Sequence, residues 1–139
     1  MAEAAINYLA VLAAAIVSMI VGGLWYSPLL FGKAWMKLMN LDEKKLEEAK
    51  KKGMTKSYVI AFIGSLVTAY VLAHFVDYAG AVDYVGALQL SFWIWLGFFA
   101  AAMLSSILWE GKPVKLYLIN IFHYLVSLCV MSLILALWI

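Results

Sequence analysis

Two polar side chains stand three positions apart in the last long apolar stretch of the sequence, residues 115–138. Because residues three apart lie on one face of a helix, Asn120 and His123 should point the same way. An amide and an imidazole on one face can bind a small molecule or an ion, and His123 can also carry a proton. The alternative is that both side chains hydrogen-bond a neighbouring helix and hold it in place.

Serines on the three other long apolar stretches extend this polar face. Each lies about as far as His123 does from the end of its stretch that adjoins a lysine-containing segment. The sequence contains no HExxH or CxxC motif, no glycine-rich phosphate loop and no Ser/His/Asp set in a plausible frame. We therefore expect no catalytic residues, no metal and no cofactor, and we do not expect an enzyme. If the four faces converge, they form one polar layer made of Ser18, Ser65, Ser105, Asn120 and His123.

The elements that must position these residues are membrane helices. The chain is 67% apolar and 13% charged, against about 45–50% and about 25% in an ordinary soluble domain. Four apolar stretches reach the roughly 20 residues that a spanning helix needs. The first lacks the basic start of a signal peptide, so we expect it to stay uncleaved. The pattern predicts an all-α integral membrane protein with one domain over residues 1–139 and spans at about 5–26, 57–77, 85–109 and 115–138.

The lysines predict the orientation in the cell membrane. Eight of the ten lie in the segment 27–56, which joins the first two spans, and the other two are Lys112 and Lys115. Since lysine-rich loops stay in the cytoplasm, we expect 27–56 and 110–114 to be cytoplasmic and both termini to lie outside. A net charge of +2, confined to so few segments, does not indicate a nucleic acid as a partner.

Small residues recur at every fourth position of the first span, at Ala10, Ala14, Ser18 and Gly22, and similar ladders occur on the second and third spans. Such faces let helix backbones approach closely in lipid. They predict tight packing within one bundle or, alternatively, an interface between subunits. Because four spans leave little room for a pore inside one subunit, we expect a homo-oligomer, with a dimer as the first candidate.

The two halves of the chain also resemble each other. The run AAAIVSMI at 13–20 resembles AAAMLSSI at 100–107, and LVT at 66–68 resembles LVS at 125–127. The first and third spans run in the same direction, so a duplication would give a 2+2 parallel repeat, as in some transporters. The alternative is that apolar helices resemble each other through composition alone.

The stretch GGLWYSPLLFGKAW, residues 22–35, is the least interchangeable part of the sequence. Trp25 and Tyr26 suit the headgroup depth of a membrane, where amphipathic rings gather. Ser27 fits a helix N-cap, and Pro28 fits the first position of a new helix. We therefore predict a corner at which the first span turns into another helix. Its structural residues are Gly22, Gly23, Trp25, Tyr26, Ser27, Pro28, Phe31, Gly32 and Trp35.

The helix after the corner should lie in the membrane plane. Phe31 and Trp35 share one of its faces, which should point into the bilayer, whereas Lys33 and Lys37 share another and suit lipid headgroups. A second short helix, rich in charged residues, is predicted at about 43–52. Together they give an interfacial helix and a charged helix between the first two spans.

The run GLWYSPLLFGKAWM at 23–36, followed by a charged segment and three further spans, resembles the signature of a family of small prokaryotic four-helix membrane proteins, domain of unknown function 1761. The resemblance covers nearly the whole chain. The resemblance implies a four-span membrane protein with no established activity. It therefore assigns no functional residues to this chain, only the motif positions as a structural corner.

These observations predict a small transporter, channel or ligand-binding protein that uses an inner-leaflet polar layer around Asn120 and His123. The alternative is a non-catalytic membrane module that organises lipids or partner proteins through the corner and the lysines. The expected partners are membrane lipids and a small molecule or an ion.

Overall fold

The structure is a computed structural model that describes residues 4–40 and 42–138, and it contains four helices long and apolar enough to cross a membrane. They are α1 (Tyr8–Trp25), α4 (Thr55–Ala79), a third span (Tyr84–Leu108) and α7 (Val114–Leu137). The described residues form no strand. The prediction of an all-α membrane protein with four spans is confirmed, and each predicted end falls within a few residues of the observed one.

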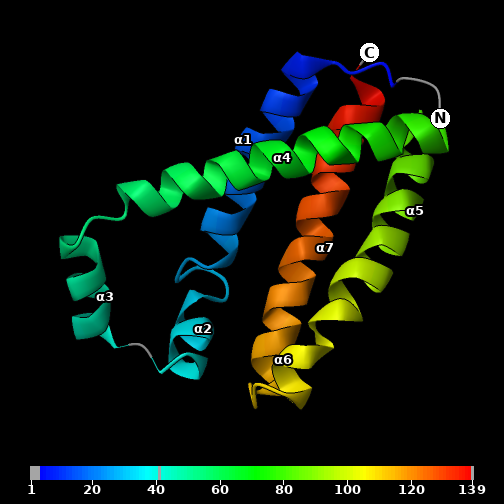
Figure 1. The fold of residues 1–139 in the computed structure, drawn as a ribbon. Coiled ribbons are helices and arrows are strands. Elements are labelled where there is room, and N and C mark those ends of the chain that lie inside the picture. The colour runs from blue at the N-terminus through cyan, green and yellow to red at the C-terminus, as the bar shows by residue number, and fades with distance from the viewer. Residues whose placement is uncertain (1–3, 41, 139) are drawn as a thin grey trace.

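Helix α7 is the centre of the fold, because it packs against α1, α4 and α5 (Tyr84–Ile94). In Figure 1, α1, α7 and α5 run side by side with α7 in the middle. On α1, the side chains of Ala10, Ala14 and Ala15 are completely buried. Two of these belong to the predicted small ladder, so that part of the ladder packs within a single chain.

Helix α4 runs across α1 and α7 rather than alongside them (Figure 1). Its buried residues are all in its C-terminal half. Toward the N-terminus its side chains are mostly exposed, and Tyr58 is 60% exposed. The N-terminal half of α4 therefore projects away from the buried core and leaves a space beside α1 and α7.

The third span is interrupted, whereas the sequence predicted one continuous helix. A π-helical segment, η1 (Trp95–Ala100), and a 3-10 turn, η2 (Ala102–Leu104), separate α5 from α6 (Ser105–Leu108). The hydroxyl of Tyr117 on α7 donates a hydrogen bond to the carbonyl of Ala100, in the interruption. Irregular backbone inside a membrane needs such partners, because lipid offers none.

The corner after α1 is a tight turn, and the next helix begins later than predicted. Helix α2 spans Gly32–Leu38 instead of starting at Pro28. The hydroxyl of Ser27 donates to the carbonyl of Leu24 at 2.6 Å. The predicted N-cap at Ser27 is therefore wrong. The last turn of α1 has carbonyls without helical partners, and the serine hydroxyl bonds to one of them instead of capping α2.

Gly32 allows this turn to close. Its N–H donates to the carbonyl of Ser27 at 2.8 Å, and the N–H of Phe31 donates to the carbonyl of Trp25 at 2.9 Å. A Cβ at position 32 would lie 2.6 Å from the carbonyl oxygen of Ser27. Real side chains do not approach backbone that closely, so the corner requires glycine at this position.

A charged helix, α3 (Glu43–Lys51), follows α2. The carboxylate of Asp42 accepts a hydrogen bond of 2.7 Å from the N–H of Lys45, which caps the start of the helix. Beyond its end, Gly53 has a φ of 91°, the left-handed conformation that commonly follows a helix. The location of α2 in the membrane plane stays a prediction, as does the internal repeat, whose first span is continuous and whose third is interrupted.

Candidate functional site

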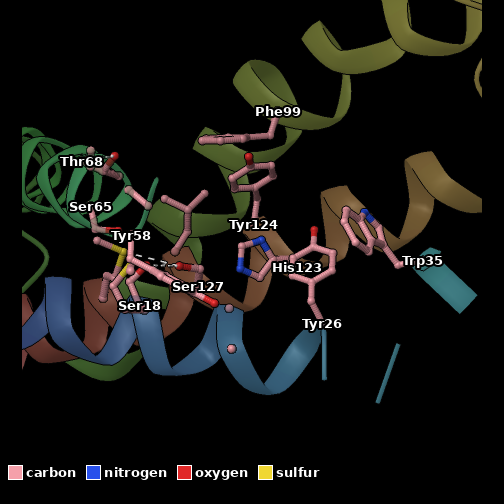
Figure 2. A pocket seen from close by; sticks show the side chains of 17 residues that line it. Ser18, Tyr26, Trp35, Tyr58, Ser65, Thr68, Phe99, His123, Tyr124 and Ser127 are labelled. Atoms are coloured by element: carbon pink, nitrogen blue, oxygen red, sulfur yellow. Dashed lines mark hydrogen bonds between the residues drawn. The ribbon is translucent and has the colours of Figure 1, made fainter. Parts of the chain in front are cut away.

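A cavity of about 770 Å³ lies between α1, the N-terminal half of α4, α7 and η1, with one residue contributed by α2 (Figure 2). The cavity occupies the space that α4 leaves by crossing α1 and α7. Small-molecule sites in proteins have volumes of about 300–1,000 Å³, so the cavity has the size of a ligand site.

One wall of the cavity is a row of five rings in which each packs against the next. In Figure 2 these rings follow one another from α2 through α7 to η1. Neighbouring ring centroids are 5.6, 5.2, 5.1 and 4.8 Å apart, within the range that aromatic pairs prefer. We call this wall the aromatic row. Its members, in order, are Trp35, Tyr26, His123, Tyr124 and Phe99.

The wall formed by α4 and α1 carries small and hydroxyl-bearing side chains. Figure 2 shows Ser65 and Thr68 on α4, on the far side of the cavity from the aromatic row. A Cβ added at Gly64 would meet no atom within 4 Å, so the space beside it is open. The small residues of this wall are Ser18, Gly22, Gly23, Ala61, Gly64, Ser65 and Thr68.

His123 lies at the centre of the aromatic row, and both of its ring nitrogens are buried without a hydrogen-bond partner among the described residues. A neutral imidazole has one donor and one acceptor. Leaving a buried polar group unpaired costs about 1–3 kcal/mol. A Cβ on Gly22 would lie 3.4 Å from Nε2, so this glycine lets the ring sit close to α1. Because neither nitrogen has accessible surface, a ligand group would reach the imidazole only after the ring or a neighbouring side chain shifted.

Asn120 lies behind the row and does not line the cavity. Its side-chain carbonyl accepts a hydrogen bond of 2.7 Å from the hydroxyl of Tyr26. Burial raises the pKa of Tyr26 to about 12, with a smaller contribution from Tyr124, so the hydroxyl keeps its proton and remains a donor. The adjacent Trp25 donates through Nε1 to the carbonyl of Ile119 at 3.0 Å. These bonds attach the corner to α7 and position Tyr26 in the aromatic row.

Two of the three predicted serines line the cavity, and one does not. The hydroxyls of Ser18 and Ser127 share a hydrogen bond of 2.9 Å, and Ser65 lines the wall on α4. Ser105 is exposed on α6, away from the cavity, so its predicted place in the layer is wrong. The π-helical turn before it rotates every later side chain of that span, which no regular helix would do. The predicted layer is thus reduced to Ser18, Ser65 and His123, with Asn120 behind Tyr26.

The sequence did not indicate most of the aromatic row. Trp35 was predicted to point into the bilayer together with Phe31, but Phe31 precedes α2 and Trp35 packs against Tyr26. Tyr124 directly follows His123, and residues one apart on a helix diverge by about 100°. Phe99 belongs to the π-helical segment, whose direction no regular helical pattern predicts. The polar face that Asn120 and His123 share on α7 was the sequence pattern that indicated a member of the row, His123.

The chemistry of the lining is that of an uncharged binding site. Within the described part of the chain, no Asp, Glu or Lys lines the cavity. The same residues hold no group of three or more His, Cys, Asp or Glu that could bind a metal ion. The cavity can therefore stack a ring and exchange hydrogen bonds with it, but it offers no fixed charge to an ion.

Comparison with known proteins gives one match. The sequence model of a family described as "Protein of unknown function (DUF1761)" matches residues 9–136, which include nearly all of the four spans and the whole corner. No curated protein and no solved structure matches the chain. All residues that line the cavity lie within the matched range.

Proposed function

The chain belongs to the DUF1761 family of proteins of unknown function, and we propose that it binds a small molecule in this cavity and moves it through the membrane. The observation that carries the proposal is the aromatic row with His123 at its centre, whose ring nitrogens are buried and unpaired. Unpaired polar groups are rare in native proteins, and where they occur they call for a ligand, a water or a role in function. The proposal includes no catalytic step.

Movement of the ligand is supported by the way the cavity walls are built. The wall on α4 belongs to the half of that helix that projects from the core, while the other half holds the helix in place through Ala69, Leu72, Ala73 and Val76. Another part of the lining is the interrupted third span. Transporters often build their sites from interrupted helices and open them by moving one repeat or bundle of helices against the other. A shift of the N-terminal half of α4 would open or close this cavity.

The orientation follows from the lysines. Tyr26 and Trp35 in the aromatic row belong to the corner, which directly precedes the lysine-rich segment. The positive-inside rule assigns that segment to the cytoplasm. The proposed site therefore lies in the cytoplasmic half of the cell membrane, and both termini lie outside.

The test is native mass spectrometry of the protein released from its own membranes. Gly64→Phe should fill the open space beside α4, because a Cβ at this position meets no atom within 4 Å. Ile63→Phe is the matched control, since Ile63 is 53% exposed and does not line the cavity. We expect wild type and Ile63→Phe to retain one small molecule that Gly64→Phe loses. The same spectra give the subunit number, for which we propose a dimer.

Bulk lipids alone on all three proteins would contradict the proposal and favour a second function, a module that organises lipids or partner proteins. The exposed residues of the corner support that alternative. Leu29 and Leu30 are 85% and 56% exposed, and Lys33 and Lys37 are exposed one turn apart on α2. Apolar and basic side chains together are typical of surfaces that bind anionic membranes.

A further inference from the structure

We infer that the ligand is an uncharged molecule with a flat, conjugated ring and a hydroxyl or carbonyl group at the edge of that ring. The inference rests on the proposed function, because it names the chemical class that the same cavity takes. Three features of the lining carry it: the lack of charge, the contrast between the two walls, and the hydroxyl groups that remain available.

Charged side chains are kept away from the cavity. The chain has ten basic and eight acidic residues, yet among the residues described by the structure none of them lines this space. A charged ligand would lose its hydration and find no opposite charge, which is strongly unfavourable inside a membrane protein. The cavity therefore selects against anions, and a cation would be held only by its attraction to the ring faces, without a counter-charge.

The two walls together favour a flat ring. On one side, consecutive rings of the aromatic row, from Tyr26 through His123 to Tyr124, have centroids 5.2 and 5.1 Å apart and are tilted by 57° and 56°, so they present both ring edges and ring faces. On the other side, Ala61 and Gly64 have little or no side chain and leave space between larger neighbours, Met19 and the ring of Tyr58. Aromatic groups stack face to face with an offset or meet edge to face, and a saturated ring of the same size gains neither arrangement.

Hydroxyl groups at the cavity can bind a polar group on the ring. Ser18 and Ser127 share a hydrogen bond of 2.9 Å, and Ser127 also donates to Sδ of Met131 at 3.6 Å. A thioether sulfur is a weak acceptor, so a ligand oxygen would replace it readily. The two ring nitrogens of His123 are also unpaired among the described residues, but they have no accessible surface, so a ligand would bond to them only after the ring shifted. A hydroxyl or a carbonyl on the ligand ring can accept the proton of Ser127, and a hydroxyl can in addition donate to a serine oxygen.

Four bicyclic probes of similar size separate these features. They are 2-naphthol, which is flat and neutral, 2-naphthoate, which is anionic, 1-methylquinolinium, which is cationic, and decahydro-2-naphthol, which is neutral but not flat. Binding is measured at pH 7 by titration calorimetry on the full chain in lipid nanodiscs, with protein-free nanodiscs subtracting partition into lipid. Wild type, Gly64→Phe and the control Ile63→Phe are compared.

We expect wild type and Ile63→Phe to bind 2-naphthol about tenfold or more tightly than each of the other three probes, and Gly64→Phe to lose this binding. If a charged probe or decahydro-2-naphthol binds wild type equally well and Gly64→Phe abolishes that binding, the ligand class is wrong and the proposed site stands. If no probe distinguishes wild type from Gly64→Phe, both the ligand class and the proposed function are overturned.

Discussion

Tyr26 and Asn120 lie 94 positions apart in the sequence, and a hydrogen bond of 2.7 Å joins their side chains. The bond attaches the corner after α1 to the central helix α7. It also holds the Tyr26 ring between Trp35 and His123 in the aromatic row. This contact therefore contributes both to the fold of the corner and to the shape of the cavity, together with the bond from Trp25 to the carbonyl of Ile119.

The first prediction concerns the energetic coupling of these two residues. Tyr26→Phe and Asn120→Leu should each lower the free energy of unfolding by about 1 kcal/mol, because each removes one partner of a part-buried hydrogen bond. The double variant should lose less than the sum, with a coupling of about 0.6 kcal/mol or more. Denaturation in detergent measures all four proteins, and Tyr84→Phe, at a tyrosine 62% exposed, should match wild type. Strictly additive losses would show that the bond does not couple the two elements.

The second prediction concerns the glycine of the corner. Gly32→Ala should lower the free energy of unfolding by more than about 2 kcal/mol, because its Cβ would lie 2.6 Å from the backbone oxygen of Ser27. Gly23→Ala is the control, since a Cβ there meets no atom within 4 Å and α1 continues through it. Alanine favours a helix over glycine by about 0.5–1 kcal/mol, so Gly23→Ala should be neutral or stabilising. Equal melting temperatures for the two variants would contradict the tight turn.

The spans and the polar face of α7 could be predicted from the sequence because they depend on local composition and helical spacing. A run of apolar residues reports the length of a membrane helix. The spacing of Asn120 and His123 predicts a common direction, and in the structure both side chains face the corner. Asn120 accepts a hydrogen bond from Tyr26, and the ring of His123 packs against the ring of Tyr26. The small residues Ala10 and Ala14 similarly predict close packing, and both are buried.

The crossing of α4 and the interruption of the third span could not be predicted in the same way. Lipid and protein interior are equally apolar, so hydropathy does not distinguish the buried Ala73 from the exposed Val67. A π-helical turn adds one residue without a recognisable sequence, and the regular spacing that was applied to Ser105 then fails. The face assigned to Trp35 failed because it required the start of a short helix to within one or two residues.

The third prediction concerns the exposed lysines of α2. Replacing Lys33 and Lys37 with Gln should reduce the preference of the reconstituted protein for anionic lipid, because each lysine near a membrane surface contributes about 1 kcal/mol. Tryptophan quenching by brominated anionic and brominated zwitterionic lipids measures this preference as a ratio. Lys50→Gln with Lys51→Gln, on α3, is the matched control of equal charge. A larger effect from the α3 pair would mean that α3 rather than α2 contacts the headgroups.

The fourth prediction separates a ligand site from structural packing at His123. Asn120 has a partner in Tyr26, whereas neither ring nitrogen of His123 has one among the described residues. His123→Phe keeps a ring in the row and removes two unpaired polar atoms, so its free energy of unfolding in detergent should equal or exceed that of wild type by up to about 1 kcal/mol.

Asn120→Leu should instead destabilise the protein, because the hydroxyl of Tyr26 loses its acceptor. In native mass spectra we expect His123→Phe to lose the small molecule that wild type retains, despite its intact fold. If His123→Phe melts as early as Asn120→Leu and keeps that molecule, then His123 holds helices together through contacts that the phenyl ring cannot make. A stable His123→Phe that has lost its ligand would show that wild type keeps the unpaired imidazole, at a cost in stability, because the ligand needs it.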